Sequence, residues 1–521
     1  MSDYAERIRS RMSGSPDHIP QSYPPIGSIS GSLDPPRAIT EGSNKRQFLA
    51  AFAATMGNLV MGTCIAWSGS ALPGLKLPAA QDGFEVTESE GSWIGSLLPL
   101  GALLGAPLGG YLSSRFGKKG AMFLDAGFFS VGYLILAVAP VTWTLYIGRF
   151  VCGIATGISC TTCPIYVAEI STPNYRGLLG SGMQVMVVLG VLLSISVGAV
   201  LSWRWLSIVC LAAVLLWSVL LFLVPETPAQ HIMDKKYREA RESLEWLRET
   251  IYVEAEYEEI QQSVEDGISR SGGIQDLIKS ENLAPLIISL VLMFGQQMSG
   301  MNAVLFYVVD IFTAAGSSIP PSIESIIVAL VQVVATILGA IFMDKLGRRF
   351  LLIFSSLVMV ISISSVGAYF YIKDNLGDTD LATKLQILPV ASLSIFVFAF
   401  SVGFGPIPWL MTAEIFSPEV RGPASSIATA FNWALAFIVT KFFSNLVSAI
   451  SEAFSFWVFG SLTALVLLFC VLFVPETKGK SLDSIQSMFR SGSPYFLEIG
   501  VWKLCRRRSR PDQVLLVEEE Y

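Results

Sequence analysis

Residues 295–307 read GQQMSGMNAVLFY and lie inside a long apolar segment of the chain. The stretch carries three amide side chains, Gln296, Gln297 and Asn302, where a bilayer-crossing helix is expected to be apolar. An amide without a hydrogen-bond partner costs several kcal/mol in hydrocarbon, so these side chains should face a protein interior or a wet cavity. In a straight helix Gln297 and Asn302 would lie about 140° apart, and the Ser299–Gly300 pair between them predicts a bend. A bent helix with uncharged amides suits an uncharged, hydroxyl-rich ligand.

The composition indicates a protein that crosses a membrane many times. Of the 521 residues, 52% are hydrophobic and 15% are charged, and the mean hydropathy is +0.57. Soluble domains carry about 25% charged residues. Apolar segments of about 20 residues, the length that a membrane-spanning helix needs, recur along the chain and predict twelve spans. They lie near 48–70, 91–112, 120–140, 144–166, 178–200, 206–224, 283–309, 322–343, 350–371, 386–411, 423–446 and 454–474.

Several functional classes are excluded by what the apolar segments lack. The two histidines, His18 and His231, lie outside these segments, which argues against histidine metal sites, histidine proton relays and Ser–His catalysis. No acid–base pair, nucleophile with a base or phosphate-binding loop falls in the segments. The net charge of −6 comes largely from loops and the acidic tail and gives no indication of a nucleic-acid partner. We therefore expect no enzyme activity, no catalytic residue, no metal, no cofactor and no nucleic acid.

Lysine and arginine in the short loops predict the orientation in the membrane. The loops after the second and the eighth segment are basic, whereas the loop after the first is acidic. We expect a multi-pass protein of the cell membrane, in contact with the lipid bilayer, with both termini and the middle loop cytosolic. The predicted parts are a disordered cytosolic N-terminal arm (1–46), an N-terminal six-helix bundle (47–224), a cytosolic linker with amphipathic helices (225–282), a C-terminal six-helix bundle (283–477) and a cytosolic tail (478–521).

The linker contains four apolar residues at helical spacing, Ala240, Leu244, Leu247 and Ile251, among Arg, Lys and Glu. This pattern predicts a short amphipathic helix under the bundle. A dedicated partner site is the alternative interpretation, and no further feature of the linker supports it.

The two halves of the chain repeat the same short motifs in the same order. Six spans in each half give the two copies the same topology, so the sequence predicts an all-α membrane protein with two parallel six-helix repeats. The matching pairs are 115–119 (RFGKK) with 345–349 (KLGRR), 168–177 with 413–422, and 224–227 with 474–477 (VPET in both).

Each set of repeated motifs places acids and bases together at the cytosolic side of its half. They are either anchors at the membrane boundary or an ionic latch that stabilises an outward-open state; the recurrence of mixed charges in both halves favours the latch. A surface pair contributes only about 0.2–1 kcal/mol, so only a network could bias the states. The residues are Arg115, Glu169, Arg176 and Glu226 in the first half, and Arg348, Arg349, Glu414, Arg421 and Glu476 in the second.

Together these motifs resemble the sugar porters of the major facilitator superfamily. The resemblance covers nearly the whole membrane region, and residues 403–443 look most like the insect facilitated trehalose and hexose transporters. The motifs that carry it are GRF (148–150), PIYVAEISTPNYRG (164–177), PETP (225–228), QQMSGMNAVLFY (296–307), GPIPW (405–409) and PETKGKSL (475–482).

The resemblance implies a twelve-helix major facilitator fold and a small-molecule sugar as the ligand. Amides can answer sugar hydroxyls as donors and as acceptors, and tryptophan offers a flat face to the ring. For Gln184 and Gln332 an interhelical hydrogen bond is an equal alternative, and Trp433 could pack against sugar or, more commonly, lipid. The implied sugar-binding residues are Gln184, Gln296, Gln297, Asn302, Gln332, Trp409 and Asn432.

The chain departs from the family pattern at three positions. Gln230 and the preceding alanine follow PETP where many relatives have an arginine, and Ser114 replaces the acid before the first basic loop motif. Ser401 stands where mammalian hexose facilitators carry an acid. These departures leave the fold prediction unchanged and bear on the latch and the substrate.

Proton coupling needs a titratable group in the transport path. The first span has no titratable acid or base. Where proton-coupled relatives carry an aspartate in this span, this chain has Cys64, although Arg149 matches the arginine that pairs with that aspartate in those relatives. Asp125, expected to act as an anchor or loop partner, and Lys441 are the other candidates. We expect facilitated diffusion by a functional monomer; a proton-coupled symporter and a sugar sensor with little transport are the alternatives.

Overall fold

The computed structural model describes residues 44–76, 85–269, 277, 280–316, 319–377, 379–480, 484, 485 and 489. Nearly all of the predicted N-terminal arm and most of the tail lie outside the described residues. Within these ranges every element is helical, and ten helices are long and apolar enough to cross a membrane. Two of the ten, α3 and α18, reverse direction at a residue with positive φ, Gly117 (79°) and Ser451 (77°), and contain two spans each. The described helices therefore provide the twelve predicted spans.

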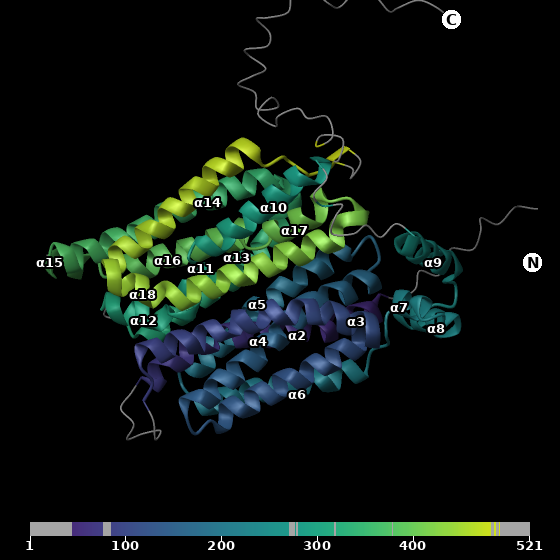
Figure 1. Ribbon diagram of the computed structural model, residues 1–521, viewed down its shortest axis with the longest axis horizontal. Helices are drawn as coiled ribbons and strands as arrows, with labels where there is room; N and C mark the ends of the chain where they lie inside the picture. The colour runs from purple at the N-terminus through teal and green to yellow at the C-terminus, as the bar shows by residue number, and fades with distance from the viewer. Residues whose placement is uncertain are drawn as a thin grey trace, which may run out of the picture. The chain divides into compact units, whose positions relative to one another are not determined.

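The first half of the chain forms one group of helices and the second half forms another beside it (Figure 1). The first-half helices are α2 (Lys45–Leu75), α3 (Glu88–Val138), α4 (Thr142–Ile170), α5 (Arg176–Gly198) and α6 (Trp203–Phe222). The second-half helices are α10 (Ser280–Met298), α11 (Met301–Phe306), α12 (Val308–Ala315), α13 (Pro321–Leu346), α14 (Arg348–Phe370), α15 (Thr379–Lys384), α16 (Leu388–Ala399), α17 (Ile407–Ile415) and α18 (Pro418–Phe473), with π-helical turns η2 (Tyr371–Asn375) and η3 (Phe400–Phe404). The halves touch where α3 meets α18 and where α5 meets α13.

Glycines allow the first-half helices to approach one another closely. A Cβ added to Gly105 of α3 would lie 2.0 Å from the carbonyl oxygen of Ile154 in α4. A Cβ added to Gly62 of α2 would lie 1.9 Å from the Val187 oxygen in α5. In a membrane, where lipid is as apolar as a side chain, such backbone contact is a main source of helix association.

Three short helices follow the first half at one end of its bundle: α7 (Pro228–Met233), α8 (Tyr237–Arg248) and α9 (Glu254–Ser269) (Figure 1). The predicted amphipathic helix is α8, and Ala240, Leu244 and Leu247 are buried as expected. The prediction for Ile251 was wrong: α8 ends at Arg248, the next residue has a φ of 53°, and Ile251 is 74% exposed.

Arg248 attaches these short helices to the first half. Its guanidinium donates to Gln47 Oε1 of α2 (2.6 Å) and to the carbonyl oxygen of Ile170 at the end of α4 (3.1 Å). It also makes an ion pair with Glu256 of α9 (2.6 Å). One buried side chain thus links four helices.

Candidate functional site

The amide-bearing stretch bends where the sequence predicts. Helix α10 ends at Met298 and α11 begins at Met301, and Gly300 between them has a φ of 86°, which glycine adopts at little cost. The hydroxyl of Ser299 donates to the Gln296 carbonyl oxygen (2.7 Å), which closes the end of α10. The bend is confirmed.

The bend brings the amides of this stretch together with an amide of α18. Asn302 Nδ2 donates to Gln297 Oε1 (2.5 Å), and Gln297 Nε2 donates to Asn432 Oδ1 (2.9 Å). Asn432 Nδ2 in turn donates to Gln296 Oε1 (2.8 Å). Four residues of the predicted sugar site therefore form one hydrogen-bonded group, which we call the amide chain. Gln296, Gln297 and Asn432 are buried, and Asn302 is half-buried.

The remaining predicted site residues lie on three other helices. Gln332 is on α13, and its Oε1 is buried without a hydrogen-bond partner in the described part of the chain. Gln184 is half-buried on α5, which packs against α13 from the other half. Trp409 is half-buried on α17. A buried amide oxygen without a partner is costly, so Gln332 is a position where a ligand donor would be favourable.

Trp433, next to Asn432, does not face lipid. Its side chain is 8% exposed and packs with Ala436 and, across the contact between the halves, with Ala102 of α3. The more common interpretation of a membrane tryptophan was therefore wrong at this position.

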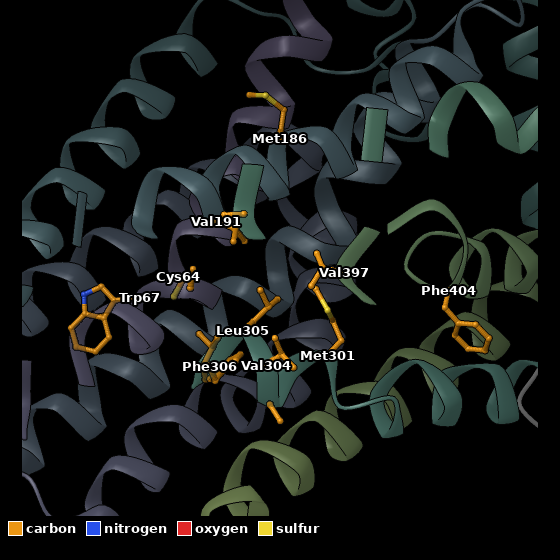
Figure 2. Packing of buried hydrophobic residues seen from close by; sticks show 14 of the residues in the cluster. Cys64, Trp67, Met186, Val191, Met301, Val304, Leu305, Phe306, Val397 and Phe404 are labelled. Atoms are coloured by element: carbon orange, nitrogen blue, oxygen red, sulfur yellow. The ribbon is translucent and has the colours of Figure 1, made fainter. Parts of the chain in front are cut away.

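The second half also packs on the first at α11. Figure 2 shows Val304, Leu305 and Phe306 of α11 in the same hydrophobic cluster as Cys64 and Trp67 of α2. The contact is close because α2 carries a glycine there: a Cβ on Gly69 would lie 2.5 Å from the Leu305 oxygen. The helix segment beyond the bend is thus held against the first half.

At the end that carries the basic loops, here called the basic end, the first half forms a compact charge cluster. Lys118 Nζ lies 3.3 Å from Glu169 Oε1 and donates to Gln230 Oε1 (2.7 Å). The Thr227 hydroxyl donates to Glu169 Oε2 (2.5 Å). Glu226 accepts the backbone N–H of Lys119 (2.9 Å), and burial raises the pKa of the Glu226 carboxyl.

The second half repeats this arrangement with the matching residues. Arg348 pairs with Glu414 (3.1 Å), to which the Thr477 hydroxyl also donates (2.6 Å). Glu476 accepts the backbone N–H groups of Arg348 (2.9 Å) and Arg349 (3.1 Å). The duplication seen in the sequence therefore extends to individual hydrogen bonds.

Glycine makes room for the second carboxylate of each cluster. Gly117 and Gly347 have φ values of 79° and 92°. A Cβ at Gly117 would lie 2.4 Å from Glu226 Oε2, and a Cβ at Gly347 would lie 2.6 Å from Glu476 Oε2. Both the backbone conformation and the space require glycine at these positions.

Three arginines of the predicted latch lie elsewhere. Arg115 is exposed, and Lys118, which was not in the predicted set, is the base that lies beside Glu169. Arg176 donates to the carbonyl oxygen of Ser171 (3.4 Å), and Arg421 donates to that of Phe416 (3.3 Å). Each acceptor lies five residues before its arginine. Gln230, one of the departures from the family pattern, belongs to the first-half charge cluster, because its amide oxygen accepts from Lys118.

At the opposite end of the bundle, charges join the two halves. Lys76, after α2, lies 3.0 Å from Glu88 of its own half and 2.9 Å from Asp310 of α12 in the other half. Burial lowers the pKa of Lys76, but the carboxylates of Asp310 and Glu88 outweigh it and raise the pKa overall. Lys441 of α18 donates to the hydroxyl of Ser92 on α3 (2.7 Å), which also crosses between the halves.

Arg149 and Cys64, expected to be neighbours, are in contact. The Arg149 guanidinium is fully buried; Nη1 donates to the Cys64 carbonyl oxygen (2.8 Å), lies 3.7 Å from Cys64 Sγ, and Nε donates to the Ile94 oxygen (3.0 Å). Asp125, in contrast, is not the anchor or loop partner that was expected: it is fully buried, and neither carboxyl oxygen has a hydrogen-bond partner in the described residues.

Twelve spans in two matching halves, with uncharged amides at the centre and charge clusters at the basic end, define a membrane transporter of the major facilitator fold. Residues 49–489 match the family described as sugar (and other) transporter, and the chain belongs to this family. Being a member of this transporter family, it is not an enzyme.

Curated relatives and solved structures agree with this assignment. The chain is 39% identical over 443 residues to the facilitated trehalose transporter Tret1 of Culex quinquefasciatus, which covers 84% of this chain and 85% of that protein. It is 38% identical over 446 residues to Tret1 of Apis mellifera ligustica, with 85% and 88% covered. The xylose transporter XylE from E. coli, in a partially occluded inward-open conformation, matches with a TM-score of 0.70 and 26% identity over 84% of this chain and 100% of that chain.

Proposed function

We propose that this chain is a uniporter that moves a neutral sugar, trehalose or a hexose such as glucose, down its gradient by alternating access. The amide chain is the observation that carries the proposal, because every polar side chain in it is uncharged and can donate or accept. A sugar presents many hydroxyl groups that need such partners. The names of the insect relatives support trehalose as the first sugar to test.

The proposed sugar site combines residues from both halves. Gln184 contributes from the first half, and Gln297, Asn302, Gln332 and Trp409 contribute from the second. Gln296 and Asn432 complete the site from within the amide chain, where both are buried. The unpartnered Oε1 of Gln332 supports this placement, since a sugar hydroxyl could donate to it.

The charges at the two ends support alternating access. We place the basic end in the cytosol, with both termini, and the end with Lys76 outside the cell membrane. Every ion pair named above at the basic end stays within one half, whereas Lys76–Asp310 joins the halves at the outer end. This pattern fits an inward-facing state, and the charge clusters at the basic end are the proposed components of a latch for the outward-facing state.

Uniport is supported by the lack of a carboxylate beside Arg149 among the described residues. Its neighbour in the first span is the thiol of Cys64, and no ion pair of Arg149 with a carboxylate occurs in the described residues. The buried Asp125 is the observation that favours the second candidate, a proton-coupled symporter, because an unpartnered buried carboxyl can carry a proton.

Uptake assays separate the two candidates. In cells that lack sugar uptake, we expect saturable entry of radiolabelled trehalose or glucose, with no acidification or alkalinisation of a weakly buffered medium under a clamped potential. Asp125→Asn should leave this uptake within about twofold, because no proton has to be carried. Stoichiometric proton entry, abolished in Asp125→Asn, would instead establish the symporter.

The outer ion pair should set the balance between the two states. We expect Asp310→Asn to favour the outward-open state by up to about fivefold, because a partly exposed ion pair contributes about 0.2–1 kcal/mol. The measurement is the rate at which a membrane-impermeant maleimide labels a cysteine placed at Ser96, a buried position on α3.

Glu88→Gln is the matched control for Asp310→Asn. It removes the other carboxylate from Lys76, at 3.0 Å, but that pair lies within the first half and should not affect the labelling rate. The reversed pair, Lys76→Asp with Asp310→Lys, should restore slow labelling. Equal labelling of all four proteins would show that the ion pair does not close the outer end.

A further inference from the structure

The first half contains a buried amide whose oxygen is not hydrogen-bonded within the described residues. Asn58 lies on α2 and is 5% exposed, and its Oδ1 has no partner in that part of the chain. Gln332 of the second half is in the same situation. Because an unpaired buried amide oxygen is costly, Asn58 is a second position where a donor from a ligand would be favourable.

Asn58 lies on the face of α2 that is turned toward the second half. An α-helix turns about 100° per residue, so Gly69 follows Asn58 by three turns and about 20° and shares its face. A Cβ on Gly69 would lie 2.5 Å from the Leu305 oxygen of α11. On the two adjoining faces, Gly57 packs against α6 and Gly62 against α5. Asn58 therefore lies between these two first-half contacts, on the side of the second half.

Gln184 of α5 lies at the same level of the bundle as Asn58. The helices α2 and α5 run in the same direction: Gly62 packs on Val187, and two turns later Ser70 donates to a carbonyl oxygen farther along α5 (3.4 Å). Asn58 and Gln184 each precede the contact at Gly62 by about one turn. The first half thus places two amides at one level.

This level is nearer the basic end than Asn302 is. The contact of Gly69 with Leu305 is followed, along both segments, by the ion pair of Lys76 with α12, so α11 and α12 run in the direction of α2. At about 1.5 Å per residue, Asn58 precedes Gly69 by about 16 Å, and Asn302 precedes Leu305 by about 4.5 Å. The two asparagines are therefore about 12 Å apart along the axis of the bundle. A single hexose ring at Asn302 ends short of Asn58, whereas two linked rings cover the interval.

We propose that Asn58 and Gln184 form a subsite for the second ring of a disaccharide, on the basic-end side of the amide chain. Asn58 is then a residue that determines specificity for disaccharides over hexoses. An amide can donate to one ring hydroxyl and accept from another, as a neutral sugar requires. The proposal rests on the proposed function, because it names the substrate class of that same sugar site.

Asn58→Leu tests the subsite in the purified full chain. Leucine has a similar volume and no polar atom, so the Kd of trehalose should rise about tenfold, the effect of one lost hydrogen bond, while the Kd of glucose stays within about twofold. The midpoint of thermal unfolding without sugar should be unchanged or higher, because the variant removes a buried oxygen that has no partner in the described residues. A residue with a purely structural role would lower the midpoint instead.

Thr55→Val is the matched control on the same helix. Thr55 is as buried as Asn58, but its hydroxyl donates to the Phe52 oxygen of its own helix (3.1 Å). The Kd of both sugars should therefore stay within about twofold of that of the unmodified protein. Asn58→Ala is a second test variant, which removes the same amide without adding bulk, and it should show the same selective loss for trehalose.

The outcomes separate the subsite from the proposed function. An unchanged Kd of trehalose in both Asn58 variants, or an equal rise for trehalose and glucose, would overturn the subsite alone. Binding of glucose without trehalose by the unmodified protein would also overturn only the subsite. If the unmodified protein binds trehalose alone, a higher Kd in both Asn58 variants and not in Thr55→Val remains the expected result. Absence of binding of either sugar would overturn the proposed function and the subsite together.

Discussion

Replacing Gln297 by leucine is expected to weaken sugar binding about 10- to 100-fold while the protein remains folded. Gln297 joins the amide chain at its centre, accepting from Asn302 at 2.5 Å and donating to Asn432 at 2.9 Å. Leucine fills a similar volume and can do neither, so both asparagines lose a partner at the place where the sugar would bind. Unpaired buried polar groups cost about 1–3 kcal/mol, which corresponds to this range of affinity.

The measurement is the Kd of trehalose and of glucose for the purified protein, with thermal unfolding as a check on folding. Met298→Leu is the control, since it introduces leucine at the next position of α10 without removing an amide. An unchanged Kd in a well-folded Gln297→Leu protein would remove the amide chain from the sugar site.

Gly105→Val is expected to abolish the folded protein. The added Cβ would lie 2.0 Å from the Ile154 oxygen, and that oxygen belongs to the backbone of α4. The clash is with backbone, so no side-chain rotation can relieve it, and α3 and α4 would have to move apart. The loss of this packing exceeds the marginal stability of a folded protein.

Gly110→Val on the same helix is the matched control, because nothing lies within 4 Å of a Cβ built at Gly110. We expect a normal monodisperse peak in size-exclusion chromatography for Gly110→Val and none for Gly105→Val. A normal peak for both variants would show that the contact between α3 and α4 is not needed for folding.

Much of the fold followed from local patterns. Hydropathy predicted the twelve spans, because a chain that crosses hydrocarbon must hydrogen-bond all its backbone N–H and C=O groups internally, which a helix with apolar side chains does. The Ser299–Gly300 pair predicted the bend, since glycine alone readily takes the positive φ found at Gly300. The convergence of Gln297 and Asn432 on one group could be expected only through the family resemblance, because 135 residues separate them.

Other features depended on contacts that no local pattern encodes. Gly117 turns the chain so that Lys118, and not Arg115, reaches Glu169. The role of Gln230 could not be predicted, because nothing in the local sequence shows that its amide oxygen accepts from Lys118.

The carboxylates of Glu226 and Glu476 are bound largely by main-chain N–H groups, and this affects how the two copies can drift apart after duplication. A backbone N–H donates whatever side chain its residue carries. Position 119 is therefore lysine and the matching position 349 is arginine, and both keep the bond to the carboxylate. The requirement for one residue type falls on Gly117 and Gly347, because a Cβ there would lie 2.4 Å and 2.6 Å from the carboxylate oxygens. In such a motif, backbone N–H groups bind the charge, and the glycine leaves the space in which the carboxylate can reach them.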